Sequence, residues 1–170
     1  MNEQNKYIYY QVVDMPGFTA DSLTKNALYF VKSVYRNIKF KQQSSTDNIT
    51  LVNKFLPYNV MSFSKHESGE IDYSFNVECK DNKYRYWLTD FTFTPYEKNR
   101  YGVFVPKLGI NMPLETAISR LDKKELEGYL DQTGTFCKQT GEKLKKYMTE
   151  GAKSNKPAQQ PVKKVVTDKW

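Results

Sequence analysis

The chain has 170 residues and a formal net charge of +7, with 26 Lys and Arg against 19 Asp and Glu. A chain of this length usually forms one domain, and its 13 Tyr and 10 Phe can fill a hydrophobic core. The sequence has no apolar run of roughly 18 residues, the length of a membrane-spanning helix, and its 2 cysteines are too few for a disulfide scaffold or a zinc site.

The positive charge is concentrated at the C-terminus. Residues 151–170 hold five Lys against one Asp in a polar, Pro-containing, aperiodic stretch. This composition predicts a disordered Lys-rich tail after a single folded domain over residues 5–150. Such a tail is usually only solvated; the alternative is an electrostatic arm for nucleic acid or another polyanion.

The beginning of the chain, MNEQNKYIYY, lacks the basic-then-apolar pattern of a signal peptide. We therefore expect either a cytoplasmic protein or the mature part of an exported one.

Residues 7–13 are β-branched and aromatic, which predicts a strand that ends at the turn residues 14–17. A helix then follows, with Thr19 as its N-cap and with Phe18 and Leu23 in the positions of a hydrophobic staple. Residues 38–63 are typical of one or two strands, interrupted at SSTDN and at Pro57. Helical spacing predicts one apolar face on the helix, formed by Leu23, Ala27, Phe30, Val31 and Val34.

Residues 71–94 predict a β-hairpin that turns at Asp81-Asn82, because Asp and Asn tolerate positive φ. If this turn sets the register, Lys80 pairs with Lys83, and the apolar face of the hairpin belongs to the core. Asp90 then lies on this apolar face, where it would satisfy a buried tyrosine hydroxyl or a backbone amide. On that face the register opposes Cys79 to Tyr84, Val77 to Tyr86, Phe75 to Leu88 and Tyr73 to Asp90.

The opposite face of this hairpin contains the candidate binding residues. Arg85 lies opposite Glu78, which favours a cross-strand ion pair over an anion site. Trp87, Phe91 and Phe93 share the face and predict a surface for a partner protein or for a covering loop. A nucleic-acid stacking platform is the minority interpretation, because the carboxylates of Asp72 and Glu78 on this face would repel phosphate.

Residues 95–113 form a long apolar connection with Gly102, Pro106, Gly109 and Pro113. A segment of this length either folds over the sheet or presents a binding surface, for which Tyr101 and Phe104 are the candidate residues.

A second helix begins at the N-cap Asp122 and runs through Glu150. Its glycines 128, 134 and 141 each cost about 1 kcal/mol relative to Ala, so we expect it to depend on tertiary packing. We also expect Cys79 and Cys137 to be free buried thiols. The apolar stripe of this helix comprises Leu126, Leu130, Thr133, Cys137, Thr140, Leu144 and Met148.

The sequence contains no motif of catalysis, cofactor binding or metal binding. His66 is the only histidine and lies in a polar turn, and glycine-rich phosphate loops and HExxH, GxSxG or CxxC patterns are absent from the sequence. We therefore expect a protein that is not an enzyme, with no catalytic residues, no metal ligands and no cofactor.

The first helix, Phe18–Val34, and the hairpin segment Lys80–Arg85, followed by Thr89-Asp90-Phe91, resemble the domain of unknown function 4468. This is an exported family of the Bacteroidota described as having a TATA-binding-protein-like (TBP-like) fold. The resemblance covers roughly residues 7–95. It implies an α+β fold, in which the helices pack on one face of an antiparallel sheet and the last element is a C-terminal helix. It also implies a periplasmic or cell-envelope location, and it lends no catalytic residues.

Together these features predict a non-enzymatic, envelope-associated binding module with a protein or glycan partner. The binding residues would be Arg85, Trp87, Phe91 and Phe93 on the sheet, with Tyr101 and Phe104 on the long connection. The sequence holds one copy of the fold, without an internal repeat. Acidic groups also lie on the face of the hairpin that contains the candidate binding residues. Both features disfavour nucleic acid as the partner. The sequence leaves open whether the protein is a monomer or a homodimer.

Overall fold

The computed structural model describes residues 5–35, 40–43, 48–59 and 66–151. Its elements follow the order β1 (Tyr9–Asp14), α1 (Ala20–Val34), β2 (Phe40–Gln43), β3 (Asn48–Phe55), β4 (Gly69–Lys80), β5 (Lys83–Lys98), β6 (Phe104–Pro106), β7 (Met112–Pro113), a short 3-10 helix (Ala117–Ser119) and α2 (Lys123–Glu150). The predicted tail lies outside the described residues apart from Gly151.

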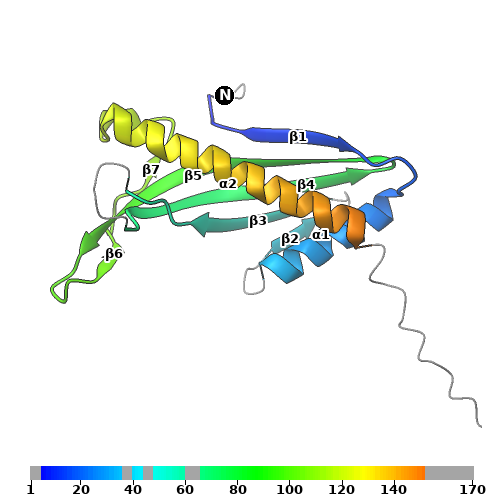
Figure 1. Ribbon diagram of the computed structural model, residues 1–170, viewed down its shortest axis with the longest axis horizontal. Coiled ribbons are helices and arrows are strands. Elements are labelled where there is room, and N and C mark those ends of the chain that lie inside the picture. Colours follow the sequence, from blue (N-terminus) through cyan, green and yellow to red (C-terminus); the bar gives the residue numbers. More distant parts are fainter. Residues whose placement is uncertain (1–4, 36–39, 44–47, 60–65, 152–170) are drawn as a thin grey trace, which may run out of the picture.

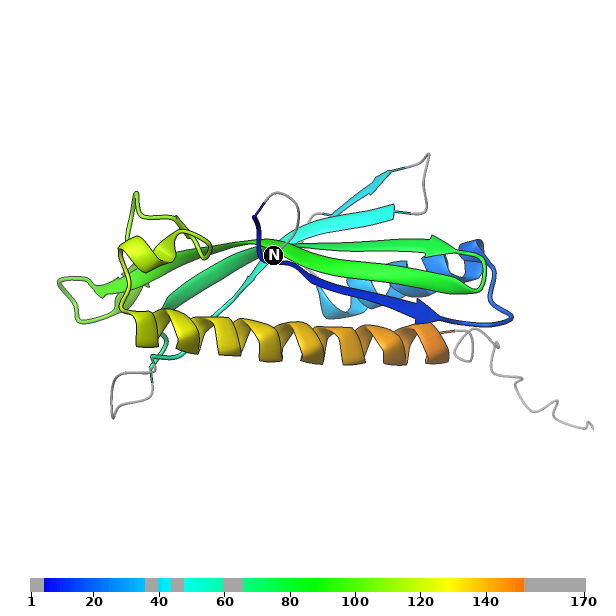
Figure 2. The same ribbon diagram turned by 90° about the horizontal axis from the view of Figure 1, so that it is seen from above.

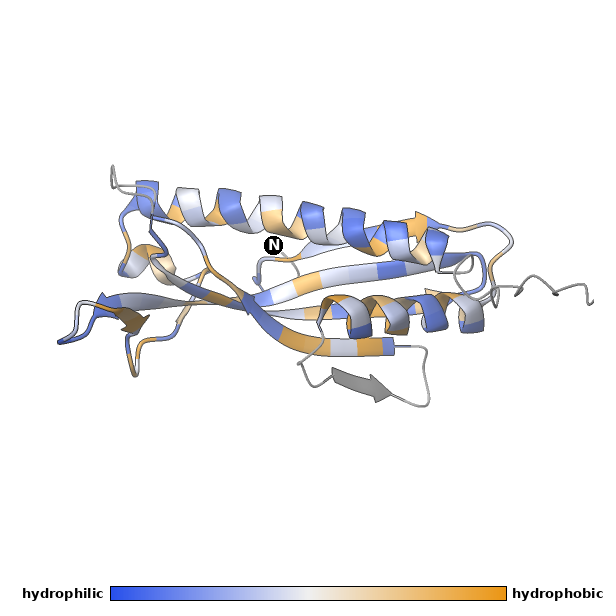
Figure 3. Ribbon diagram, turned by 60° about the horizontal axis from the view of Figure 1, so that its bottom comes forward, coloured by the Kyte–Doolittle hydropathy of each residue, from blue (hydrophilic) through white to orange (hydrophobic). Residues whose placement is uncertain are grey.

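The strands form one antiparallel sheet in the order β1-β5-β4-β3-β2, and β6 and β7 pair with the far end of β5. Both helices lie on the same side of this sheet (Figures 1 and 2). Along α2, hydrophilic and hydrophobic residues alternate as expected for a helix with one buried side (Figure 3). The predicted α+β architecture, with helices on one face and a C-terminal helix, is confirmed.

The β4–β5 turn also anchors the beginning of α1. Asn82 adopts a φ of 64°, as the turn requires. The Asp81 carboxylate accepts a hydrogen bond of 2.8 Å from the backbone N–H of Ala20, next to the N-cap Thr19, whose hydroxyl accepts from Ser22. A carboxylate beside the N-terminus of a helix also complements the helix dipole. The predicted turn and cap are therefore joined into one corner of the fold.

The side of the sheet that faces the helices holds a largely aromatic core. Phe30 of α1 packs against Phe75 of β4, with ring centroids 5.9 Å apart. Phe93 of β5 packs against Tyr129 of α2 at 4.6 Å. Cys79 and Cys137 are buried thiols that are not joined in a disulfide, as expected. The apolar faces predicted for the two helices differ from the structure at two residues. Val34 was expected to be buried but is 38% exposed at the end of α1, and Tyr129, which was not expected there, belongs to the buried stripe of α2.

The hairpin register is as predicted from the turn as far as the pair Ser74–Thr89, and it then changes. Asp72 pairs with Thr92 and not with the expected Phe91. Between the pairs Ser74–Thr89 and Asp72–Thr92, β5 has one residue more than β4. Asp90 has a φ of 57°, which identifies it as the bulged residue in the left-handed conformation. It is exposed and forms an ion pair with Lys6. The predicted place of Asp90 on the apolar face is therefore wrong.

The bulge also corrects the prediction for two aromatic residues. Side chains alternate between the faces of a strand, so one inserted residue moves all later side chains to the other face. Phe91 and Phe93 consequently point into the core, where they are 2% and 1% exposed. Their predicted place on the open face of the sheet was wrong for this reason.

The fit of α2 against the sheet predicts opposite effects for two of its glycines. A Cβ atom at Gly141 would lie 1.9 Å from the hydroxyl oxygen of Tyr86, whereas a Cβ at Gly134 meets no atom within 4 Å. Gly141→Ala should therefore lower the free energy of unfolding by about 1–3 kcal/mol. Gly134→Ala should raise it by up to about 1 kcal/mol through helix propensity. Urea unfolding of both variants checks this, and equal effects at the two positions would contradict the described packing.

The bulge predicts that position 90 is sensitive to the shape of its side chain. Asp90→Val should destabilise the protein by about 1–3 kcal/mol, because a β-branched residue is strained at positive φ. Asp90→Gly loses the exposed ion pair but relieves the backbone, so its free energy of unfolding should stay within about 1 kcal/mol of the parent. Thermal and urea unfolding provide the measurement. Equal tolerance of Val and Gly would show that the residue is not in the left-handed conformation.

Candidate functional site

The face of the sheet opposite the helices is the candidate site, and we call it the open face. It is formed by alternate residues of β1, β5, β4 and β3. Tyr10 and Val12 of β1 lie beside Trp87 and Arg85 of β5, their direct partners in the ladder. Val52 of β3 lies on the same side. Tyr10, Val12 and Val52 are 45%, 51% and 61% exposed, and Trp87 is partly buried.

The polar groups of the open face are held by one another. The guanidinium of Arg85 donates from Nε to the Glu78 carboxylate at 2.9 Å and lies over the Trp87 ring, 5.6 Å from its centroid. Glu78 and also Tyr10 raise the pKa of Arg85. The predicted cross-strand ion pair is thus present, and the charge of Arg85 is already matched.

The same pattern continues across β3 and β4. Thr50 donates to the side-chain oxygen of Asn76 at 2.8 Å, and Lys54 donates to Glu70 at 2.6 Å. Partial burial raises the pKa of the Asp72 carboxyl, and the nearby carboxylate of Glu70 raises it further. On the open face Arg85, Glu78, Thr50, Asn76, Lys54 and Glu70 therefore form cross-strand polar pairs between exposed apolar side chains.

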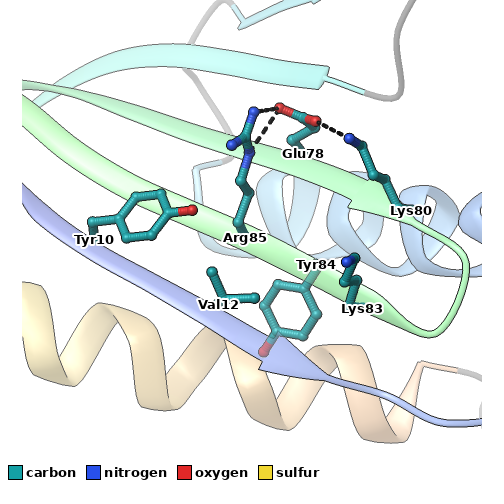
Figure 4. A pocket seen from close by; sticks show the side chains of 7 residues that line it. All are labelled: Tyr10, Val12, Glu78, Lys80, Lys83, Tyr84 and Arg85. Atoms are coloured by element: carbon teal, nitrogen blue, oxygen red, sulfur yellow. Dashed lines mark hydrogen bonds and ion pairs between the residues drawn. The ribbon is translucent and has the colours of Figure 1, made fainter.

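A shallow hollow of about 150 Å³ lies at the β1–β5 edge of this face. Figure 4 shows Tyr10 and Val12 on one side of it and the Arg85–Glu78 pair on the other. Lys80 also lines it, and its ammonium lies 3.6 Å from Glu78. Aromatic, aliphatic and charged groups meet here within reach of one small ligand group or one side chain of a partner.

The structure separates the six predicted binding residues into three groups. Arg85 and Trp87 lie on the open face, while Phe91 and Phe93 lie in the core beneath it. Tyr101 and Phe104 belong to the β5–β6 end, which lies at the other end of the sheet from the β4–β5 turn (Figure 1). Along β5 the distance from Arg85 to Lys98 is roughly 43 Å at about 3.3 Å per residue. One small ligand cannot contact both groups.

The segment 95–113 is partly packed and partly exposed, so it folds over the sheet in part, and its role as a binding surface stays a prediction. Met112 near its end is buried. Tyr101 is 74% exposed at the tip. Phe104 is stacked on His66 with ring centroids 4.9 Å apart, and the Lys98 ammonium lies 5.2 Å from its centroid.

Sequence reasoning missed Tyr10, Val12 and Val52 as open-face residues. The alternation in residues 7–13 places Tyr10 and Val12 on one side of a strand. Which side faces solvent depends on the pairing of β1 with β5, whose paired residues are 69 to 79 positions apart in the chain. That pairing has no local signal in the sequence.

Within the described ranges, no three or more His, Cys, Asp or Glu side chains group together as a metal site would require. None of the helices built from those residues has both the length and the apolar character needed to cross a membrane. Burial raises the pKa of the Cys137 thiol to about 12, which keeps this sulfur protonated.

Comparison with known proteins identifies the family. Residues 9–94 match the family model described as "Domain of unknown function (DUF4468) with TBP-like fold". A TBP-like protein from Parabacteroides distasonis has a crystal structure with a TM-score of 0.61 at 12% identity, covering 85% of this chain and 96% of that one. A DUF4468 family protein from Bacteroides ovatus gives 0.60 at 14% identity, covering 95% and 93%. No curated protein matches the chain.

At these identities the two crystal structures show that the fold is shared. The family model itself spans just over half of the 170 residues, from β1 to the part of β5 beyond the bulge. The chain therefore belongs to the DUF4468 family of domains of unknown function with a TBP-like fold.

Proposed function

We propose that this protein is a non-enzymatic binding module of the cell envelope that docks a partner protein on its open face. The observation that carries the proposal is the contrast between the two sides of one sheet. One side packs against α1 and α2, whereas the other exposes Tyr10, Val12 and Val52 beside Trp87. Tyr, Trp and Arg are the residue types that most often dominate the energetics of protein interfaces.

The state of the polar groups favours a protein over a glycan. A sugar needs free donors and acceptors around an exposed aromatic ring. Here the Trp87 ring is covered by Arg85, whose Nε–H is bonded to Glu78. A flat surface with internally satisfied polar groups and isolated apolar side chains loses little hydrogen bonding when another protein covers it.

The alternative of a polyanion bound by the Lys-rich tail is not favoured by the open face. The carboxylates of Asp72 and Glu78 lie on this face and repel phosphate. The tail itself lies outside the described residues.

The non-enzymatic part of the proposal rests on the sequence, which contains no catalytic motif. The raised pKa of Cys137 makes this one thiol a poor nucleophile. The envelope part rests on the family resemblance, which implies export.

Photo-crosslinking can test the docking surface in living cells. With p-benzoylphenylalanine at position 52, ultraviolet light should join the protein to a discrete partner protein. The same residue at position 108 is the matched control, because Leu108 is 92% exposed on the connection between β6 and β7. Val52→Asp should then weaken binding of the purified partner by at least about tenfold, since one buried Val contributes roughly 1.5–3 kcal/mol.

Equal adducts at positions 52 and 108, or none at either, would reject the open face as the docking surface. An adduct at position 52 that resists protease but is removed by glycosidases would identify a glycan and reject a protein partner.

Cell fractionation tests the location separately. The untagged protein expressed from its native gene should be recovered with the periplasmic or membrane fraction. Recovery with the cytoplasmic marker proteins alone would remove the envelope from the proposal.

A further inference from the structure

β1 is an edge strand with a free side. In the strand order it is paired only with β5, and the ladder runs from Tyr9–Leu88 to Asp14–Lys83. The next pair continues the same register, because the backbone N–H of Met15 donates to the carbonyl oxygen of Asn82 at 2.7 Å. Hydrogen-bonded pairs alternate in an antiparallel ladder. The odd-numbered residues of β1 therefore bond to β5, and the even-numbered ones point their peptide groups away from it.

The carbonyl of Tyr7 confirms this alternation, since it accepts a hydrogen bond from the Thr89 hydroxyl of β5. The peptide groups of Tyr10, Val12 and Asp14 thus form an outward row that, within the described residues, pairs with no other strand. Four of the six residues of β1 are exposed, so the helices leave this edge open.

Edge strands are usually protected from pairing by Lys, Pro, a bulge or a charged side chain in mid-strand. The stretch from Ile8 to Val13 has none of these, and Tyr10 and Val12 are about half exposed. We propose that two copies of this protein pair antiparallel through β1, so that their sheets join edge to edge. The idea deepens the docking proposal, because the second copy would extend the open face.

One register of this pairing is self-complementary. Outward peptide groups can meet only when even-numbered residues oppose even-numbered residues. With Tyr10 opposite Tyr10 of the second copy, Ile8 opposes Val12 twice by symmetry. Apolar groups thus meet apolar groups on both sides of the two-fold axis.

Neighbouring registers lose this match. A shift of two residues in one direction opposes Ile8 to Asp14, which places a charge against an aliphatic side chain at both ends. A shift in the other direction opposes Ile8 to Tyr10 and leaves Val12 beyond the end of the other strand. On the other face the favoured register opposes Tyr9 to Gln11, so the choice of register rests on the side chains of the open face.

Pairing would complete the hollow beside Arg85. Tyr10 and Val12 form its outer wall at the free edge, and the second copy places its own Ile8, Tyr10 and Val12 directly beyond this wall. The open faces of the two copies then form one continuous surface across the two-fold axis.

Disulfide trapping tests both the pairing and its register. Opposed residues in a hydrogen-bonded pair have Cα atoms about 5.5 Å apart, within the range of a disulfide. Tyr10→Cys should therefore form a covalent dimer under mild oxidation. The native Cys79 and Cys137 are buried and should not contribute. Val12→Cys is the register control, because the two copies of position 12 would lie roughly 13 Å apart along the strands.

Val52→Cys is the control for random collision, since Val52 is 61% exposed on β3, away from the β1 edge. Cross-linking at position 10 well above positions 12 and 52 supports the proposal. Preferential cross-linking at position 12 overturns the register, and equal cross-linking at all three positions overturns the pairing.

Analytical ultracentrifugation of the full chain without ligand tests the unmodified edge. The parent protein should show twice the monomer mass at micromolar concentrations. Val12→Glu should restore the monomer mass, because it introduces a charge opposite Ile8 on each side of the two-fold axis. Val52→Glu makes the same change away from the edge and should remain dimeric. A monomeric parent protein would overturn the pairing and leave the docking proposal intact, because no partner protein takes part in this measurement.

Discussion

The bulge at Asp90 is the constraint on which the rest of the structure depends. β5 is the longest strand of the sheet and pairs with β1, β4, β6 and β7. On one side of Asp90 its core residues include Tyr84 and Leu88, and on the other side they include Phe91 and Phe93. One extra residue makes these two sets share a face. A regular strand would place both phenylalanines in solvent and leave Tyr129 of α2 without its aromatic partner.

Because the bulge keeps Phe91 and Phe93 on the same side of β5 as Tyr84 and Leu88, both helices can pack on that side. The close contact of Gly141 with Tyr86 brings α2 directly against the strand, while Gly134 has open space around it. On the opposite side, polar groups of neighbouring strands form cross-strand pairs. Tyr10, Val12 and Val52 remain largely exposed in the monomer, and for this reason the proposed interactions of the protein involve them.

Local rules predicted a large part of this fold. The caps at Thr19 and Asp122 and the turn at Asp81-Asn82 are set by residues close in sequence, and all three are present. The hairpin register follows from the turn by counting, so the Arg85–Glu78 pair was predictable. Counting residues from the turn gave the wrong register beyond Asp90. The bulge was missed because Gly, and not Asp, is the usual marker of a left-handed bulge. The candidate site was predicted less well. Two of its proposed aromatics depended on the register beyond the bulge, and Tyr10 and Val12 depended on the long-range pairing of β1 with β5.

The register beyond the bulge can be measured directly by nuclear magnetic resonance. Cross-strand nuclear Overhauser effects along β4 and β5 identify which backbone protons face one another. The structure predicts contacts of Asp72 with Thr92 and of Ile71 with Phe93. It also predicts that the scalar couplings at Asp90 correspond to a positive φ. Contacts of Asp72 with Phe91 in an uninterrupted ladder would contradict the account, because Phe91 and Phe93 would then belong to the open face.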